Sequence, residues 1–375
     1  MRNTRFDLVI AGAGFAGLTA AHAATVRGLN VAVIDKKPEP GSHIHTTGLL
    51  VKEVADEWDI PRRMTRKIHG IRLYAPNQNY IDLESPGYYF LATDTSAVLR
   101  QLAMQAWSTG TKLISNTPLK QLHEDQNQLT INNKYTSQFF IGADGARSTT
   151  AKLANFDTNK HYLSGVEVAM KNIKGVHEDR LHVFLDTSIA RGYIAWLVPG
   201  VDNTYQVGLA AKQPHKPDLN TFLQKLSKTF DLSSATQLHR RGGLIPIGGT
   251  LRNFYNQNTM LIGDAAGMVS PLTAGGIHPA IHLGRLAGVA TANHLIDQDI
   301  HPAKIIKQHA SKYRYKRLMR NTFDLCSHNT LYNFMLQNKL SKALAKTVFF
   351  HHRGLFSYNA WRDIVKTCFT LQPTS

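Results

Sequence analysis

The chain has 375 residues, of which 43% are hydrophobic and 18% charged, a balance typical of a folded globular protein rather than a disordered one. Its two cysteines, Cys326 and Cys368, argue against a disulfide scaffold and lead us to expect a cytoplasmic, reducing location. No apolar run reaches the roughly 18 residues that a membrane span needs, and the net charge of +17 favours an acidic or anionic partner.

The first 36 residues form the most informative segment. Residues 6–11 are apolar enough for a buried parallel strand, residues 18–26 are rich in alanine like a helix packed on a sheet, and residues 30–34 form a second apolar strand. The turn between the first strand and the helix reads GAGFAG, over residues 12–17. This strand–turn–helix–strand pattern predicts a dinucleotide-binding unit.

Each glycine of this turn has a mechanical role in such a unit. Gly12 permits the tight turn, Gly14 lets a pyrophosphate approach the backbone, and Gly17 lets helix and strand pack closely. The helix N-terminus offers free N–H groups to the phosphates. Asp35 ends the second strand, 18 residues after Gly17, and can accept hydrogen bonds from the ribose hydroxyls of an adenosine.

Two more strand-to-turn sites follow, each more than a hundred residues after the one before. An apolar strand enters the turn Gly142–Gly145, another enters the turn Gly263–Gly267, and each of these turns contains an aspartate. A single dinucleotide motif accounts for the adenosine diphosphate half of a ligand. The two additional turns suit the pyrophosphate and ribityl chain of a longer ligand, FAD.

The rest of the sequence predicts both helices and strands. Residues 49–59, 95–108, 219–230 and 276–295 are predicted as helices, and alternating runs within 71–83 and 166–209 predict strands. We therefore expect an α/β protein with a doubly wound, Rossmann-like FAD-binding domain, an inserted β-sheet-rich substrate domain and a helical, basic C-terminal segment. The expected boundaries are 1–70, 95–160 and 245–300 for the first, 71–94 and 161–244 for the second, and 301–375 for the third.

The three turns resemble those of a known superfamily. GAGFAG, GADGARS and LIGDAAGMVSPLTAGGIHPAI are similar, in order and spacing, to the three FAD signatures of p-hydroxybenzoate hydroxylase-type flavoproteins. Within that superfamily the third stretch looks closest to the geranylgeranyl reductase family, and GYIAWLVP at residues 192–199 resembles an aromatic strand of the same family. The resemblance covers residues 5–295. The loop SHIHTTG departs from it, since many geranylgeranyl reductases carry a cysteine there.

The resemblance implies a set of cofactor contacts. The first turn and the acid after it would bind the ADP part, Asp144 would support the pyrophosphate through its turn, and Asp264 would bond the ribityl hydroxyls. The start of the last helix would face the isoalloxazine, where a helix N-terminus stabilises the negative charge of reduced flavin. No metal site is expected. The expected cofactor-binding residues are Gly12, Gly14, Phe15, Ala16, Gly17, Asp35, Lys36, Asp144, Gly263, Asp264, Gly275, Gly276 and Ile277.

Candidate catalytic residues are those that could supply a proton near the flavin: His45, Thr46 and His278. The alternative is that the loop around His45 is merely solvated and that His278 points away from the flavin. Candidate substrate residues would line an apolar cavity, although aromatic side chains on a strand are as often ordinary core. They are Tyr193, Trp196 and Pro271.

We accordingly expect an FAD-dependent oxidoreductase that acts on a small apolar molecule. The first hypothesis is reduction of isoprenoid C=C bonds by hydride transfer from flavin N5. One alternative is a class A-type flavin monooxygenase that hydroxylates an aromatic or apolar substrate, and another is a flavoprotein with a mainly binding or membrane-surface role. A single GxGxxG motif leaves the electron donor open between NAD(P)H and another reductant, and the oligomeric state is also open.

The C-terminal region carries much of the charge. Residues 301–375 hold 13 Lys and Arg against two acids, which is +11 of the net +17. A basic amphipathic helix there would either pack on the protein or lie on an anionic membrane surface. Nucleic acid is not favoured, because no binding motif or stacking platform accompanies the charge. The helix is predicted from an apolar stripe, Leu336, Leu340, Leu344 and Val348, with Lys339, Lys342 and Lys346 between its members.

Overall fold

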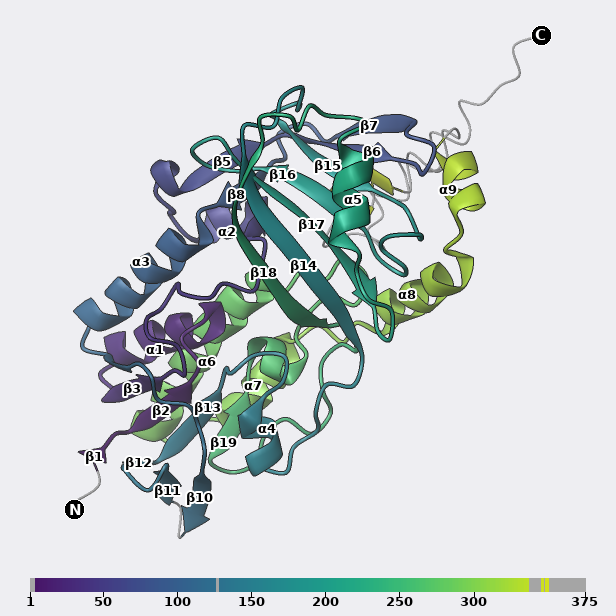
Figure 1. Ribbon diagram of the computed structural model, residues 1–375. Coiled ribbons are helices and arrows are strands. Elements are labelled where there is room, and N and C mark those ends of the chain that lie inside the picture. Colours follow the sequence, from purple (N-terminus) through teal and green to yellow (C-terminus); the bar gives the residue numbers. More distant parts are fainter. Residues whose placement is uncertain (1–3, 126–127, 337–344, 347, 351–375) are drawn as a thin grey trace. The chain divides into compact units, whose positions relative to one another are not determined.

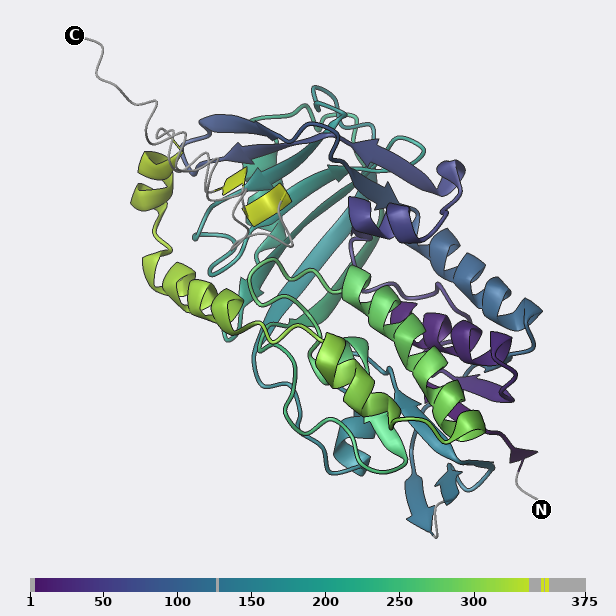
Figure 2. The ribbon, with the colours of Figure 1, turned by 180° about the vertical axis from the view of Figure 1, so that it is seen from behind.

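The computed structural model describes residues 4–125, 128–336, 345–346 and 348–350, and Figures 1 and 2 show it from opposite sides. The chain divides into two compact units. Unit 1 takes its described residues from 1–46, 94–162 and 244–318, and unit 2 takes its residues from 47–93, 163–243 and 319–375. Unit 1 therefore consists of three separate stretches of chain, with unit 2 inserted between them.

A five-stranded parallel sheet forms the centre of unit 1. Its order is β19-β13-β2-β3-β9, and every residue of the first four of these strands is buried, as short apolar strands of a covered parallel sheet should be. The order reverses between β2 and β13, which places a ligand crevice at the carboxyl ends of those two strands. The bounds are β2 (Leu8–Ala11), β3 (Val31–Ile34), β9 (Lys112–Ile114), β13 (Phe139–Gly142) and β19 (Thr259–Leu261).

Helices cover this sheet, and two of them lie unusually close together. Helices α1 and α6 run side by side (Figure 2), and a Cβ added at Gly288 of α6 would lie 2.2 Å from the carbonyl oxygen of Ala20 in α1. Only glycine permits this approach. The helices of unit 1 are α1 (Phe15–Val26), α3 (Thr95–Ser108), α4 (Thr149–Leu153), the 3-10 turn η2 (Gly263–Ala266), α6 (Ile277–Asp297) and α7 (Pro302–His309). A small second sheet contains β1 (Thr4–Arg5), β10 (Leu122–Asp125), β11 (Gln128–Ile131) and β12 (Tyr135–Ser137).

A seven-stranded, mostly antiparallel sheet dominates unit 2, in the order β18-β14-β17-β16-β15-β6-β7. Its bounds are β6 (Gly70–Tyr74), β7 (Tyr80–Glu84), β14 (Tyr162–Lys171), β15 (Arg180–Phe184), β16 (Ala195–Pro199), β17 (Thr204–Lys212) and β18 (Thr236–Pro246). A three-stranded sheet, β4 (Leu49–Val51), β8 (Phe90–Thr93) and β5 (Thr65–Ile68), accompanies it. The helices are α2 (Lys52–Glu57), the 3-10 turn η1 (Arg62–Met64), α5 (Leu219–Leu226), α8 (Arg314–Cys326), whose last eight residues belong to this unit, and α9 (Asn329–Met335).

The two faces of the large sheet bury different partners, because alternate residues of a strand point to opposite sides. One face packs against α5 (Figure 1), where Phe222 lies among Val207, Phe184 and Leu197. The other face packs Leu181 and Val183 with side chains of the three-stranded sheet. The same face buries Leu336, which is 8% exposed.

The expected fold class is confirmed: a parallel Rossmann-like sheet, an inserted sheet-rich unit and C-terminal helices. The contact division differs from the expected boundaries at residues 47–70, which group with unit 2 because β4 and β5 pair with β8, and at residues 301–318, which group with unit 1. The expected helix over residues 49–59 begins only at Lys52, since β4 occupies the preceding residues. Of the predicted C-terminal stripe, Leu340, Leu344, Lys339 and Lys342 lie outside the described residues.

Candidate functional site

The first two glycine turns meet at Gly12. Its φ of +106° belongs to the left-handed region, and a Cβ there would lie 2.3 Å from the carbonyl oxygen of Ala143. The Ala143 N–H in turn donates to the carbonyl of Ala11 at 2.8 Å. A Cβ at Gly17 would lie 1.9 Å from the carbonyl oxygen of Gly12. The turn after β2 is thus locked between helix α1 and the turn after β13 by backbone contacts alone.

The third turn, which follows β19, also lies against the start of helix α1. Gly263, with φ +60°, would bring a Cβ to 3.0 Å from the Ala16 Cβ at the start of α1. A Cβ on Gly276 would lie 3.2 Å from a carboxylate oxygen of Asp264, so the start of α6 lies against this acid. The structure therefore brings all three sequence motifs together around the N-terminus of α1.

Asp144 holds its own turn. Its carboxylate accepts hydrogen bonds from the Ser148 hydroxyl at 2.6 Å and from the backbone N–H groups of Thr149 and Thr150 at 2.7 and 2.9 Å. These contacts fix the loop between β13 and α4. This geometry gives Asp144 a part in shaping the turn, and its role toward the cofactor stays a prediction.

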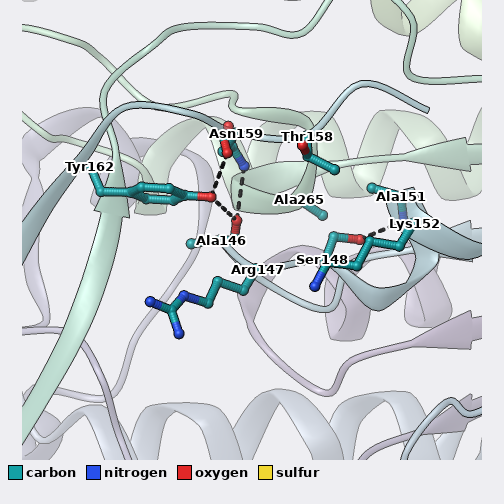
Figure 3. Close-up of a pocket in the computed structure, with 9 residues that line it drawn as sticks. All are labelled: Ala146, Arg147, Ser148, Ala151, Lys152, Thr158, Asn159, Tyr162 and Ala265. Carbon is teal, nitrogen blue, oxygen red and sulfur yellow. Dashed lines mark hydrogen bonds between the residues drawn. The ribbon is translucent and has the colours of Figure 1, made fainter. Parts of the chain in front are cut away.

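The sequence did not point to Asn159, which ties the second and third turns together. Its side-chain N–H₂ group donates to the carbonyl of Ala146 at 3.1 Å and to the carbonyl of Asp264 at 2.8 Å. Tyr162 donates its hydroxyl to the Asn159 carbonyl at 2.7 Å (Figure 3). No local motif marks this residue, because its partners are more than a hundred residues apart in the chain.

A pocket of about 270 Å³ lies beside these bonds in unit 1 (Figure 3). Its lining includes the charged side chains of Arg147 and Lys152 and the polar side chains of Ser148, Asn159 and Tyr162. A basic, polar lining suits water or a small anion.

Asp35 lies at the carboxyl end of β3, next to the first turn. Its two carboxylate oxygens accept hydrogen bonds from the backbone N–H groups of Ala13 at 2.5 Å and Lys37 at 2.7 Å. Each oxygen keeps a further lone pair, which a ribose hydroxyl could use. The neighbouring Lys36 is exposed. Asp35 is therefore held rigidly at the end of β3, and its contact with a nucleotide stays a prediction.

The start of α1 has the properties of a phosphate-binding helix. Gly14 is its N-cap, no side chain caps the helix, and its first turn contains no acid. The free N–H groups and the helix dipole therefore favour an anion. A Cβ built on Gly14 meets nothing within 4 Å, so the space in front of the turn is open. This combination fits a pyrophosphate.

Asp264 provides a second observation, after Gly14, on whether the residues of unit 1 fit FAD. No hydrogen bond to its carboxylate is found among the residues that the structure describes, and desolvation raises its pKa to about 6. A desolvated carboxylate without donors is unfavourable unless a ligand supplies them. The hydroxyls of a ribityl chain are such donors. The two observations, at Gly14 and at Asp264, show that unit 1 fits FAD.

The structure places the other predicted residues as follows. His45 is exposed and Thr46 half-buried in the loop before β4, and Pro271 is buried in the turn that precedes α6. Ile277 and His278 are the first two residues of α6, and the His278 ring lies 6.1 Å from that of His282. Their catalytic and cofactor roles stay predictions.

Tyr193 and Trp196 lie in unit 2 and have different surroundings. Tyr193 precedes β16, with the Arg320 guanidinium 5.9 Å from its ring centre, and burial raises its pKa to about 12. Trp196 lies within β16, half-buried against the apolar face that contains Val183 and Val198. Of the two, only Trp196 is a strand residue, and the substrate roles of both stay predictions.

A buried polar cluster holds the Trp196 ring. The indole N–H donates to the carboxylate of Glu167 at 2.7 Å, and Glu167 also accepts from the Thr47 hydroxyl at 2.6 Å and from Arg241 at 2.7 Å. Gly208 lies between Glu167 and Trp196 on the sheet, where a Cβ would lie 2.8 Å from the indole ring. The sequence offered one signal for this cluster: a glutamate within the apolar alternation of β14.

Comparison with known proteins agrees with this site. The family described as FAD binding domain matches residues 5–286. A digeranylgeranylglycerophospholipid reductase of Methanococcus aeolicus is 27% identical over 302 residues, covering 76% of this chain and 76% of that protein. Digeranylgeranylglycerophospholipid reductase 3 of Methanosphaera stadtmanae is 28% identical over 323 residues, covering 80% of each.

Two solved structures share the fold. A geranylgeranyl bacteriochlorophyll reductase-like protein from Thermoplasma acidophilum has a TM-score of 0.81 at 20% identity, over 98% of this chain and all of that chain. A flavin-dependent brominase has a TM-score of 0.71 at 15% identity, over 98% of this chain and all of that chain. At these identities the likeness concerns the fold, which hosts more than one flavin chemistry.

The open space at Gly14 generates the first prediction. Gly14→Val should fold, because nothing lies near the new side chain, but it should lose FAD since the side chain fills the path of the pyrophosphate. The measurement is flavin absorbance per chain after gel filtration, with circular dichroism to verify folding. Val26→Ala, at the exposed C-terminal end of the same helix, is the control and should keep its flavin. A folded Gly14→Val protein with stoichiometric FAD would refute the assignment.

The raised pKa of Asp264 generates the second prediction. If hydroxyls donate to the ionised carboxylate, its pKa falls on binding, so FAD affinity should weaken as the pH drops below about 6. Asp264→Ala should weaken binding about 10–150-fold at pH 8, from the loss of about 1.5–3 kcal/mol of charged hydrogen bonding. Titration of the flavin-free protein with FAD from pH 5 to 8 measures both effects.

Asp264→Asn should bind with a flat profile across this pH range. An unchanged dissociation constant in Asp264→Ala, or an equal pH dependence in both variants and the wild type, would place the acid away from the cofactor.

Proposed function

Because the chain belongs to the FAD-binding domain family, and is an FAD-dependent oxidoreductase as its sequence predicted, we propose that it reduces carbon–carbon double bonds of an isoprenoid lipid. The proposal is supported by relatives that are named digeranylgeranylglycerophospholipid reductases and align with most of the chain. The single structural observation that carries it is the fit of unit 1 to FAD, with open space in front of Gly14 and an Asp264 carboxylate that lacks donors among the described residues.

We assign the cofactor contacts as the sequence predicted them. Gly14 would admit the pyrophosphate, while Gly12 and Gly17 shape the turn; Asp35 would hold the adenosine ribose, and Asp264 the ribityl chain. The N-terminus of α6 would lie at the isoalloxazine and stabilise negative charge there. FAD, when bound, supplies the hydride for the reduction.

Reduction of a double bond also needs a proton at the second carbon. His278 is proposed as its source because it is half-buried in the first turn of α6, which the sequence motif assigns to the flavin edge. His45 and Thr46 are the second choice, since His45 is exposed. Either way the proton must reach a site from which apolar side chains exclude bulk water.

For the substrate we propose that Trp196 forms a fixed wall of the apolar binding region. Its indole is anchored by Glu167, whose charge is balanced by Arg241. Because the anchor is buried and fully paired, the ring keeps one orientation without presenting a charge to the lipid. Pro271 and Tyr193 are assigned secondary contacts on the strength of the sequence motif alone.

We also propose that the protein meets its substrate at an anionic membrane surface. Support comes from the +11 charge of residues 301–375 and from the lipid nature of the relatives' named substrate. In the part of the chain that the structure describes, no helix has the length and hydrophobicity of a membrane span. We propose a peripheral contact, through basic side chains of residues 301–375.

The reductase proposal predicts product formation without oxygen. The dithionite-reduced enzyme, kept anaerobic, should add two hydrogens per double bond to a geranylgeranyl lipid, as read by mass spectrometry. Trp196→Ala should raise KM roughly 10–100-fold through about 1.5–3 kcal/mol of lost apolar contact, with flavin content unchanged. Trp107→Ala, on the exposed side of α3, is the control. An oxygen-dependent hydroxylated product instead would establish the monooxygenase alternative.

The membrane proposal predicts salt-dependent binding to acidic vesicles. The protein should co-sediment with vesicles that contain phosphatidylglycerol at low salt, with about 1 kcal/mol for each basic side chain near the surface. Binding should fall as added salt shortens the Debye length. Equal sedimentation with neutral phosphatidylcholine vesicles, or none with either, would contradict the proposal.

A further inference from the structure

Helix α8 (Arg314–Cys326) has its amphipathic faces reversed. Leu318 and Leu325 are 63% and 79% exposed, and Tyr315 is 63% exposed. With about 100° of rotation per residue, these three lie within one third of the helix circumference. Arg320, on the opposite side, is 3% exposed. The helix thus turns Tyr315, Leu318 and Leu325 outward and the charged Arg320 inward.

Ionic contacts hold the helix in this orientation. The Arg320 guanidinium donates to the carbonyl oxygen of Gly192 and lies 3.0 Å from the carboxylate of Asp324. Asp324 also pairs with Lys212 of β17. A rotation that buried the leucines would break these ion pairs and leave their charges uncompensated. The apolar face is therefore fixed outward.

The apolar surface continues after the helix. Phe323 of α8 stacks on Tyr332 of α9, with ring centres 6.1 Å apart, and Tyr332 is buried. Phe334, two residues later, is 67% exposed. Isolated exposed apolar residues need no explanation, but four large ones on two consecutive helices form a patch of the kind found at interaction sites. We call Tyr315, Leu318, Leu325 and Phe334 the α8–α9 patch.

The charges around this patch indicate its partner. Lys312, Arg314 and Arg317 are exposed near its N-terminal end. From residue 300 to 335 the only acid is Asp324, which is already paired. Exposed leucine and aromatic side chains bordered by Lys and Arg are the composition of helices that lie in the interface of an anionic bilayer. An acidic protein partner would match the charges but would not require the outward leucines.

We propose that the α8–α9 patch inserts into the interfacial region of an anionic phospholipid membrane, while the neighbouring basic side chains contact the lipid phosphates. This inference rests on the proposed membrane contact and assigns it to a surface other than the predicted C-terminal stripe, whose Leu336 is buried in unit 2. The patch would hold the enzyme at the surface from which an isoprenoid lipid is drawn.

The test separates the apolar from the electrostatic contribution. Leu318→Asn/Leu325→Asn leaves the net charge unchanged and removes only apolar contact, so it should lower partition into phosphatidylglycerol vesicles at least about tenfold while the salt dependence stays. Arg314→Gln/Arg317→Gln should instead flatten the salt dependence. Met104→Asn/Trp107→Asn is the matched control: both side chains are as exposed on helix α3 as Phe334 is on α9, and the change should leave partition unaltered.

Each result decides between the proposals. If the wild type binds these vesicles and Leu318→Asn/Leu325→Asn binds equally well, the patch assignment is overturned and the membrane contact stands. No binding by the wild type overturns both, without bearing on reduction of a detergent-dispersed isoprenoid lipid. A wild-type dimer that Leu318→Asn/Leu325→Asn converts to monomer, with partition unchanged, would show that the patch meets a second copy of the chain.

Discussion

The site depends on one close contact between backbones, that of Gly12 with Ala143. Strands β2 and β13 are neighbours in the parallel sheet, and a side chain at Gly12 would collide with the Ala143 carbonyl in the turn that leaves β13. Because they can touch, the N-terminus of α1 opens into the crevice where the strand order reverses. The third turn then reaches the same helix through Gly263 and Ala16. A change in this contact would alter all three motifs at once.

In unit 2, a buried carboxylate fixes the orientation of the Trp196 ring. Ordinarily a half-buried tryptophan on a sheet is held by packing alone. Here the Glu167 carboxylate accepts a hydrogen bond from the indole N–H. A buried carboxylate requires a cation, and Arg241 supplies it. Gly208 leaves the room for the ring to reach its acceptor. The result is a Trp196 ring whose orientation is set by hydrogen bonds, with its apolar side packed on Val183 and Val198.

The same unit uses charges to orient α8. Arg320, Asp324 and Lys212 pair on the inner side of the helix, and Leu318 and Leu325 face out. Where most surface helices bury their leucines, this one exposes them at the edge of the most basic part of the chain. Cofactor binding, the proposed lipid wall and the proposed membrane contact thus rest on separate parts of the fold, which can be altered independently.

The sequence by itself determined the local units. The strands, the helix after GAGFAG, the FAD-type turns and the α/β class follow from apolar periods and from glycines whose absence of a side chain has a local purpose, as at Gly12 and Gly17. The tertiary structure decided which distant residues meet. Asn159 bonds to Ala146 and Asp264, and Thr47 and Arg241 to Glu167, through contacts that no short pattern encodes.

In the C-terminal region, amphipathic periodicity also fails to predict which side chains are buried. A period of four predicts that one helix face is apolar, but it does not say whether that face is covered. Leu336 is buried against the sheet of unit 2, whereas Leu325 is exposed because the ion pairs of Arg320 and Asp324 occupy the inner face of α8. Burial depends on what the rest of the chain places opposite a side chain, and only the folded structure contains that information.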